Sequence, residues 1–134
     1  MFPPAVPEIP ATNVDTAISY YVNALGFTHD WGDDAGGIAG LSRENCRVFV
    51  TNGAFRASYS HGEHGQHRSR EATLVFWLNL DSKDEVNRLF TEWKASGAMI
   101  VAAPEDKPWK LREFLATDPD GNLIRVFYDF SRDV

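Results

Sequence analysis

Two segments of the chain carry apolar residues at the spacing of an amphipathic helix. The first spans residues 13–26 and the second residues 82–97, and in each the apolar positions fall on one stripe. Each segment opens on a capping residue and closes on a glycine, as helices commonly do. The capping and closing residues are Asn13, Gly26, Ser82 and Gly97, and the stripes are Ala17, Ile18, Tyr21, Val22 and Leu25, then Val86, Leu89, Phe90 and Trp93. The pattern therefore predicts two helices.

Short apolar runs flank both predicted helices. In the clearest run, residues 72–80, the side chains alternate between two faces, which is typical of a strand. The sequence DPDGN at 118–122 indicates a tight hairpin turn. The predicted strands are residues 5–11, 27–31, 37–42, 46–51, 72–80, 98–102, 112–118 and 122–128. One strand precedes each helix and three strands follow it.

This order of elements occurs twice, with an offset of 69 residues between Val6 and Val75. Neither unit buries a sheet face alone, so we expect the two to pack into a curved mixed sheet around a cleft. The predicted fold is α+β, a single domain of two βαβββ units. The domain spans residues 1–134, its units are residues 1–55 and 71–134, and residues 56–70 form a histidine-rich linker loop.

Composition and charge narrow the functional classes. The 134 residues are 43% hydrophobic, and no apolar stretch approaches the ~18 residues of a membrane span. No basic face is legible, so we expect neither nucleic-acid nor membrane binding. Residues 1–42 hold five acidic groups and no Lys or Arg. This acidic third suits a cationic small ligand, and ordinary solubilising charge is the alternative explanation.

Cysteine and proline content indicate the compartment. Cys46 is the only cysteine, which excludes an internal disulfide. Residues 1–10 contain four prolines and no Lys or Arg, unlike a secretory signal helix. We therefore expect a cytoplasmic protein.

Two segments resemble the vicinal oxygen chelate superfamily of glyoxalases, extradiol dioxygenases and bleomycin-resistance proteins. AISYYVNALGF at 17–27 is similar to the family's helix-to-strand corner, and KPWKLREFLATDPDGNLIRVF at 107–127 to its terminal hairpin. The resemblance covers nearly the whole chain and implies the fold. It does not settle the function, because the superfamily hosts hydrolytic, isomerising, oxidative and purely binding members.

The resemblance also implies where a metal site belongs. The family's enzymes place inward-facing His or Glu ligands on the first and fourth strands of each unit. Transferred by motif, those positions are Val6, Phe49, Val75 and Arg125. Three of these side chains are apolar and one is a cation, so none is a metal donor. We therefore expect no metal and no cofactor.

Strand alternation predicts what lines the cleft instead. Glu8 shares a face with Val6, and the other lining groups are Arg47 and Thr51 with Phe49, Trp77 and Asn79 with Val75, and Leu123 and Phe127 with Arg125. The alternative is that these residues fill the core. A buried Arg125 requires a partner, for which we consider Glu8 first and an anionic ligand group second.

Trp31 and Trp109 are candidate rim residues that stack on a planar or cationic ligand. The KPW element at 107–109 resembles one at the edge of the binding groove of bleomycin-resistance proteins, and simple loop anchoring is the alternative. The candidate ligand-binding residues are Glu8, Trp31, Phe49, Val75, Trp77, Trp109, Arg125 and Phe127.

Other candidate groups are weaker. His61, His64 and His67 have chelating spacing, but their Gly-rich segment is typical of a solvated loop. Cys46 is interpreted as an inert thiol. His29 is a general base only if it faces the cleft.

We therefore expect a metal-free, homodimeric protein that binds and sequesters a small antibiotic-like molecule of cationic or aromatic character. Dimerisation follows from the open edges of each unit, and the N-terminal strand, stiffened by prolines, is a candidate for exchange between protomers. One alternative is a lyase, isomerase or dioxygenase-like enzyme of this fold that uses Glu8, Arg125 or His29 in acid–base chemistry. A second is a binding or regulatory module for another aromatic metabolite.

Overall fold

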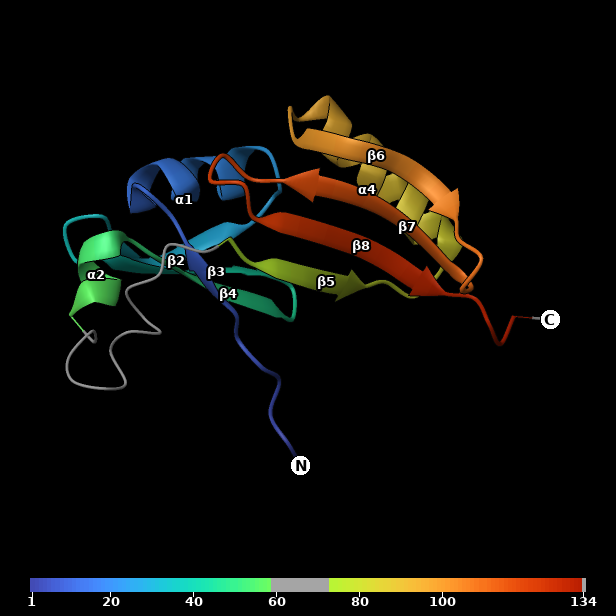
Figure 1. Cartoon of the computed structure of the whole chain (residues 1–134), viewed down its shortest axis with the longest axis horizontal. Helices are drawn as coiled ribbons and strands as arrows, with labels where there is room; N and C mark the ends of the chain where they lie inside the picture. The colour runs from blue at the N-terminus through green and yellow to red at the C-terminus, as the bar shows by residue number, and fades with distance from the viewer. Residues whose placement is uncertain (59–72, 134) are drawn as a thin grey trace. The chain divides into compact units, whose positions relative to one another are not determined.

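The computed structural model describes residues 1–58 and 73–133 and divides into two compact units, Met1–Leu74 and Val75–Val134 (Figure 1). The first unit forms a four-stranded sheet in the order β1-β4-β3-β2, with β1 parallel to β4 and the other pairs antiparallel. Its elements are β1 (Glu8–Pro10), α1 (Val14–Asn23), β2 (Thr28–Asp33), β3 (Ile38–Arg43), β4 (Cys46–Thr51) and a short helix α2 (Gly53–Ala57).

The second unit repeats this plan. Its four-stranded sheet has the order β5-β8-β7-β6, with β5 parallel to β8. The remaining pairs are antiparallel. Its elements are β5 (Val75–Asn79), α4 (Lys83–Ala95), β6 (Met99–Asp106), β7 (Leu111–Thr117) and β8 (Leu123–Asp129). The predicted α+β class with two βαβββ units is confirmed.

The long helix of each unit covers one face of the sheet in that unit. α1 packs on β2, β3 and β4, and α4 packs on β6, β7 and β8. In the first unit Tyr21 is fully buried and meets the ring of Phe27 edge to face at 5.6 Å. In the second unit Trp93 is buried against Phe114, with ring centroids 5.6 Å apart. These aromatic contacts lie on the stripes that the sequence predicts.

The predicted N-caps of both helices and the glycine that ends the second helix are confirmed. The Asn13 side chain accepts a hydrogen bond of 2.9 Å from the Thr16 N–H, and Ser82 Oγ accepts one of 3.1 Å from the Glu85 N–H. Gly97 follows α4 with φ +92°, a conformation that glycine adopts without steric cost. The DPDGN turn is also present, closed by the Asp118 carboxylate, which accepts from the Asn122 N–H at 3.0 Å.

The structure corrects three sequence expectations. α2 was not predicted, and it forms because the Asn52 side chain caps it by accepting from the Phe55 N–H at 2.9 Å. β1 is shorter than the predicted residues 5–11, and its start follows Pro7, which has no N–H to donate to a ladder. β6 is longer than predicted and carries two register shifts. The predicted linker lies largely outside the described residues. Among the described residues, no helix is long and apolar enough to cross a membrane.

Candidate functional site

The sheet of the second unit gathers aromatic side chains on the face opposite α4. Trp77 on β5 stands in register with Arg125 on β8, and Asn79 stands in register with Phe127. The rings of Trp77 and Phe127 meet edge to face at 5.5 Å. Trp77 is nevertheless 49% exposed, and Val75 beside it is 50% exposed. The register places these side chains on one face, as strand alternation predicts.

Arg125 joins this aromatic pair to a buried carboxylate. Its guanidinium carbon lies 4.9 Å from the centre of the Trp77 ring, a cation–π contact. Its Nη1 donates to Glu113 Oε1 at 3.0 Å. Glu113 stands on β7, in register with Phe127, and only 2% of it is exposed. Two neighbouring strands thus supply the two charges, and the half-buried arginine stands between the indole and the acid.

Glu113 is the residue that sequence reasoning missed, because the sequence analysis considered Glu8 first as the partner of Arg125, and Arg125 pairs with Glu113 inside its own unit. A signal was available in the alternation of β7. Phe114 and Ala116 are core positions, so Glu113 and Leu115 point to the opposite face, beside β8. A carboxylate on the strand next to a half-buried arginine, on the same face of the sheet, is within reach as its partner.

Glu113 also has an unsatisfied atom. Its Oε2 is buried and finds no hydrogen-bond donor among the described residues. A buried acceptor without a donor costs about 1–3 kcal/mol, and more when it is charged. Native structures contain few such groups, and each calls for an explanation.

The sheet of the first unit carries a different aromatic arrangement on the face opposite α1. One row of register partners crosses the sheet from Trp31 through Gly40 and Phe49 to Glu8. The indole of Trp31 lies directly on Gly40, where an added Cβ would sit 2.3 Å from its Nε1. Trp31 and Phe49 meet edge to face at 5.3 Å. Three predicted site residues, Glu8, Trp31 and Phe49, therefore lie in one row. The indole of Trp31 fits there because Gly40 has no side chain.

Polar contacts at the β1 end of this row involve Thr51 and α2. The Thr51 hydroxyl donates to Glu8 Oε2 at 3.2 Å. Arg56, reaching back from α2, donates through Nη1 to the Thr51 hydroxyl and carbonyl oxygens. At the other side of Phe49, the Arg47 guanidinium lies 5.6 Å from the ring centre. The predicted neighbours Arg47 and Thr51 thus flank Phe49 as strand alternation requires.

The remaining candidates lie elsewhere. Trp109 is 59% exposed in the turn between β6 and β7, with Lys107 Nζ 5.9 Å from its ring centre. His29 Nε2 lies 2.7 Å from the Gly32 carbonyl oxygen, and its register partner Leu41 is buried on the covered face. Cys46 opens β4, and partial burial raises the pKa of its thiol. His61, His64 and His67 lie outside the described residues.

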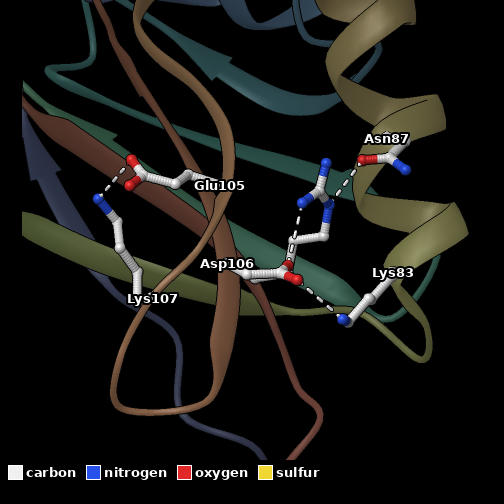
Figure 2. A network of polar contacts seen from close by, with 6 residues as sticks. Lys83, Asn87, Glu105, Asp106 and Lys107 are labelled. Carbon is white, nitrogen blue, oxygen red and sulfur yellow. Dashed lines mark hydrogen bonds and ion pairs between the residues drawn. The ribbon is translucent and has the colours of Figure 1, made fainter.

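A polar network at the far end of β6 holds α4 to its sheet (Figure 2). Asp106 accepts from Lys83 Nζ at 2.9 Å and from Arg112 Nη1 at 3.0 Å. Arg112 Nε also donates to Asn87 Oδ1 at 2.9 Å. The hydrogen bond from Lys83, followed by that from Arg112, lowers the pKa of Asp106. The charges of this partly exposed network are paired with one another, and the pairs join α4 to β6 and β7.

The four positions where the resemblance implies metal ligands do not fit a metal. Phe49 and Val75 have no donor atom, and Val6 precedes β1 with an apolar side chain. Arg125 is a cation already hydrogen-bonded to Glu113. Within residues 1–58 and 73–133, no group of three or more His, Cys, Asp and Glu side chains is placed to hold an ion. The expectation that the protein works without a metal stays a prediction.

Solved structures of other proteins have a similar fold. Three similar solved structures, all below 25% identity, are a glyoxalase/bleomycin resistance protein/dioxygenase from Nocardioides, TioX from Micromonospora sp. ML1 and a lactoylglutathione lyase from Agrobacterium tumefaciens. Their TM-scores are 0.78, 0.73 and 0.74, and their identities are 14%, 23% and 15%. The matches cover 98%, 94% and 98% of this chain and 87%, 98% and 97% of those chains. These likenesses concern the fold.

A search among curated proteins finds no match. The model of the glyoxalase/bleomycin resistance protein/dioxygenase superfamily, in contrast, matches residues 5–126. That range takes in most of both sheets, with the two tryptophan-bearing faces described above. The chain therefore belongs to the glyoxalase/bleomycin resistance protein/dioxygenase superfamily.

Proposed function

We propose that the protein binds and sequesters a small, antibiotic-like organic molecule without the help of a metal or cofactor. The observation that carries this proposal is Trp77, which stays 49% exposed although Phe127 and Arg125 hold its ring. An indole that neighbours already fix offers a large stacking surface, and little conformational entropy is lost when a ligand binds.

The groups around Trp77 are suited to orienting a ligand. Val75 adds exposed apolar surface next to the indole, and Arg125 and Glu113 add polar atoms on the neighbouring strands. Predominantly apolar and aromatic walls with a few polar groups are the usual composition of a small-molecule site. We therefore place the binding surface on the face opposite α4.

A titration tests this proposal. Bleomycin-type drugs and small planar aromatics are added to the protein, and intrinsic tryptophan fluorescence is followed. We expect Trp77→Ala to weaken the bound compound about tenfold to a hundredfold, since stacking on one aromatic ring contributes roughly 1–3 kcal/mol. Phe2→Ala is the control, because it removes a ring that is 96% exposed in the N-terminal segment. Equal affinity of Trp77→Ala and the parent contradicts the proposal.

Two further readouts separate sequestration from other functions. Affinity that survives exhaustive chelation and dialysis supports metal-free binding, and a stoichiometric ion that is required for binding contradicts it. Mass spectrometry of the compound after prolonged incubation tells whether it is recovered unchanged. A chemically altered compound favours an enzyme instead of a sequestering protein.

Trp109 supplies an independent prediction about the rim of the site. Its ring is 59% exposed in a turn, so Trp109→Ala should leave the melting temperature nearly unchanged. If Trp109 contributes stacking surface, the same change weakens the ligand about tenfold. Should the variant bind every tested compound as tightly as the parent, Trp109 only anchors its turn.

We also propose that the functional form is a homodimer. Each four-stranded sheet ends on edge strands, and β6 exposes 49% of Met99 and 57% of Val101 at one such edge. Exposed edges and apolar side chains are surfaces that a second copy can cover. Light scattering at micromolar concentration tests this proposal, and a monomeric mass contradicts it.

A further inference from the structure

Two polar groups on the face opposite α4 have hydrogen-bonding capacity that the described protein leaves unused. Glu113 Oε2 is a buried acceptor without a donor among the described residues. Arg125, a guanidinium with five N–H donors, uses Nη1 on Glu113 Oε1 at 3.0 Å, and no other hydrogen bond to it is found in the described part of the chain. A spare acceptor and spare donors therefore stand side by side.

The surroundings of this pair restrict its partner to a flat group. Arg125 lies over the Trp77 ring at 4.9 Å, and Phe127 is the register neighbour of Glu113. Because Glu113 Oε2 is buried, a ligand group reaches both polar atoms only if the side chains that cover the carboxylate move as it binds, and the group then lies along this aromatic surface. The guanidinium already supplies the positive charge beside the indole, so a second cation at this point meets repulsion.

We infer that the ligand carries a planar amide in which an N–H and the C=O point to the same side, as in a primary carboxamide or a lactam. The N–H donates to Glu113 Oε2, and the carbonyl oxygen accepts from Arg125. This inference rests on the proposed function and names the chemistry that the same face recognises. It makes Glu113 the specificity-determining residue.

The geometry of the pair excludes related groups. A trans secondary amide, such as an ordinary peptide bond, directs its N–H and C=O in opposite directions and satisfies only one of the two residues. A carboxylate has no N–H for Glu113, and an amidinium has no acceptor for Arg125. A site that pairs both polar atoms rejects a ligand that lacks one partner, because a buried group then stays unsatisfied.

A set of matched small probes tests the inference in the parent protein. Benzamide and isoquinolin-1-one present the N–H and C=O on one side, whereas N-methylbenzamide, N,N-dimethylbenzamide, benzoate and benzamidine do not. Dissociation constants are measured by NMR titration. We expect the first two to bind at least about tenfold more tightly than the other four, in line with one hydrogen bond to a charged group.

The substitution Glu113→Gln sharpens this test. The Gln oxygen still accepts from Arg125, but the second atom becomes an NH2 donor. We expect benzamide to lose about tenfold in affinity and benzoate to gain, so that the order of the two probes reverses. Glu105→Gln is the matched control, because Glu105 is the register partner of Glu113 on β6, pairs with Lys107 at 3.1 Å and is largely exposed. This control should keep the parent order.

The outcomes distinguish this inference from the proposed function. If all six probes bind within threefold of one another and Trp77→Ala weakens them all, aromatic binding stands and the amide inference is overturned. The same result is expected if an ordered water permanently satisfies Glu113 Oε2. If Trp77→Ala has no effect, the proposed function fails as well. The probe order in the parent needs no variant, so a Glu113→Gln chain that does not fold leaves the inference testable.

Discussion

The two units share one architecture and place one tryptophan each on the face opposite their helix, yet the neighbours of that tryptophan differ. In the first unit Trp31 lies on Gly40, which has no side chain. In the second unit Trp77 stands beside Arg125, whose charge is paired with the buried Glu113. The first ring rests on backbone, and the second rests beside an ion pair.

This difference shows how a repeated backbone acquires unequal chemistry. The order of strands and the covering helix are the same in both halves, because both follow from the same apolar periodicity. Side chains opposite the helix are free of that constraint. In the second unit, this face carries the buried carboxylate of Glu113. A buried charge of this kind favours one specific arrangement only when every polar atom has a partner.

The largest expected effect is on Arg125. Arg125→Leu leaves the carboxylate of Glu113, 2% exposed, without its only described partner, and we expect the free energy of unfolding to fall by about 3–5 kcal/mol. Arg47→Leu is the matched change in the first unit, where the exposed guanidinium contacts the Phe49 ring, and it should cost less than about 1 kcal/mol. Urea denaturation measures both.

The double variant Arg125→Leu/Glu113→Leu completes this test. Replacing both partners of a buried pair by apolar groups is often neutral, so the double variant should recover most of the stability that Arg125→Leu loses. If Arg125→Leu loses no more stability than Arg47→Leu, leaving the buried Glu113 carboxylate without its partner has no extra cost, and the comparison fails.

The second effect compares the two exposed tryptophans. Each indole is about half exposed, so Trp77→Ala and Trp31→Ala should each lower the free energy of unfolding by about 1–2 kcal/mol, well below the cost of a buried ring. Ligand affinity separates them, because the polar recognition groups lie beside Trp77. We expect Trp77→Ala to weaken binding more than Trp31→Ala does, and equal losses in a fluorescence titration contradict the assignment to the second unit.

The third effect concerns the glycine under Trp31. In Gly40→Ala the new Cβ lies 2.3 Å from Trp31 Nε1, so the indole must leave its position on β3 and on Phe49. We expect a changed indole N–H resonance for Trp31 with a stability loss below that of Trp31→Ala. Gly36→Ala is the control, since its Cβ meets only Asp33, at 3.3 Å from the side-chain Oδ1 and 3.8 Å from the carbonyl oxygen. If the Trp31 resonance is unchanged in Gly40→Ala, the indole does not lie on Gly40 and the interpretation is wrong.

Much of this fold was predictable from sequence because its signals are local. Caps such as Asn13 and Ser82 and the alternation of β5 depend on neighbours a few residues away. The alternation of β7 indicates the face on which Glu113 lies, but its pairing with Arg125 also depends on the register of β7 against β8, which alternation alone does not fix. The contact of Trp31 with Gly40 could not be predicted for the same reason, since Gly40 lies nine residues further along the chain and on another strand.

The smallest expected effect compares one aspartate in each unit. Asp34 accepts from the Val14 N–H at 2.8 Å at the start of α1, and this bond, with that from Asn52, lowers its pKa below 3.8. Asp106 clamps α4 through Lys83 and Arg112, which lower its pKa in the same direction. A carboxyl with a lowered pKa in the folded state stabilises the fold above its unfolded value of 3.8, and this contribution disappears as the pH falls through the lower folded value.

We therefore expect Asp34→Asn and Asp106→Asn to be less stable than the parent at pH 7 and to approach it below pH 3.8. Asp106→Asn should show the larger deficit, because it loses attraction to two cations. In Asp34→Asn, by contrast, the amide oxygen of the new side chain can still accept from the Val14 N–H. Thermal denaturation as a function of pH measures both, and a deficit that stays constant from pH 7 to about pH 3 assigns the loss to packing instead of charge.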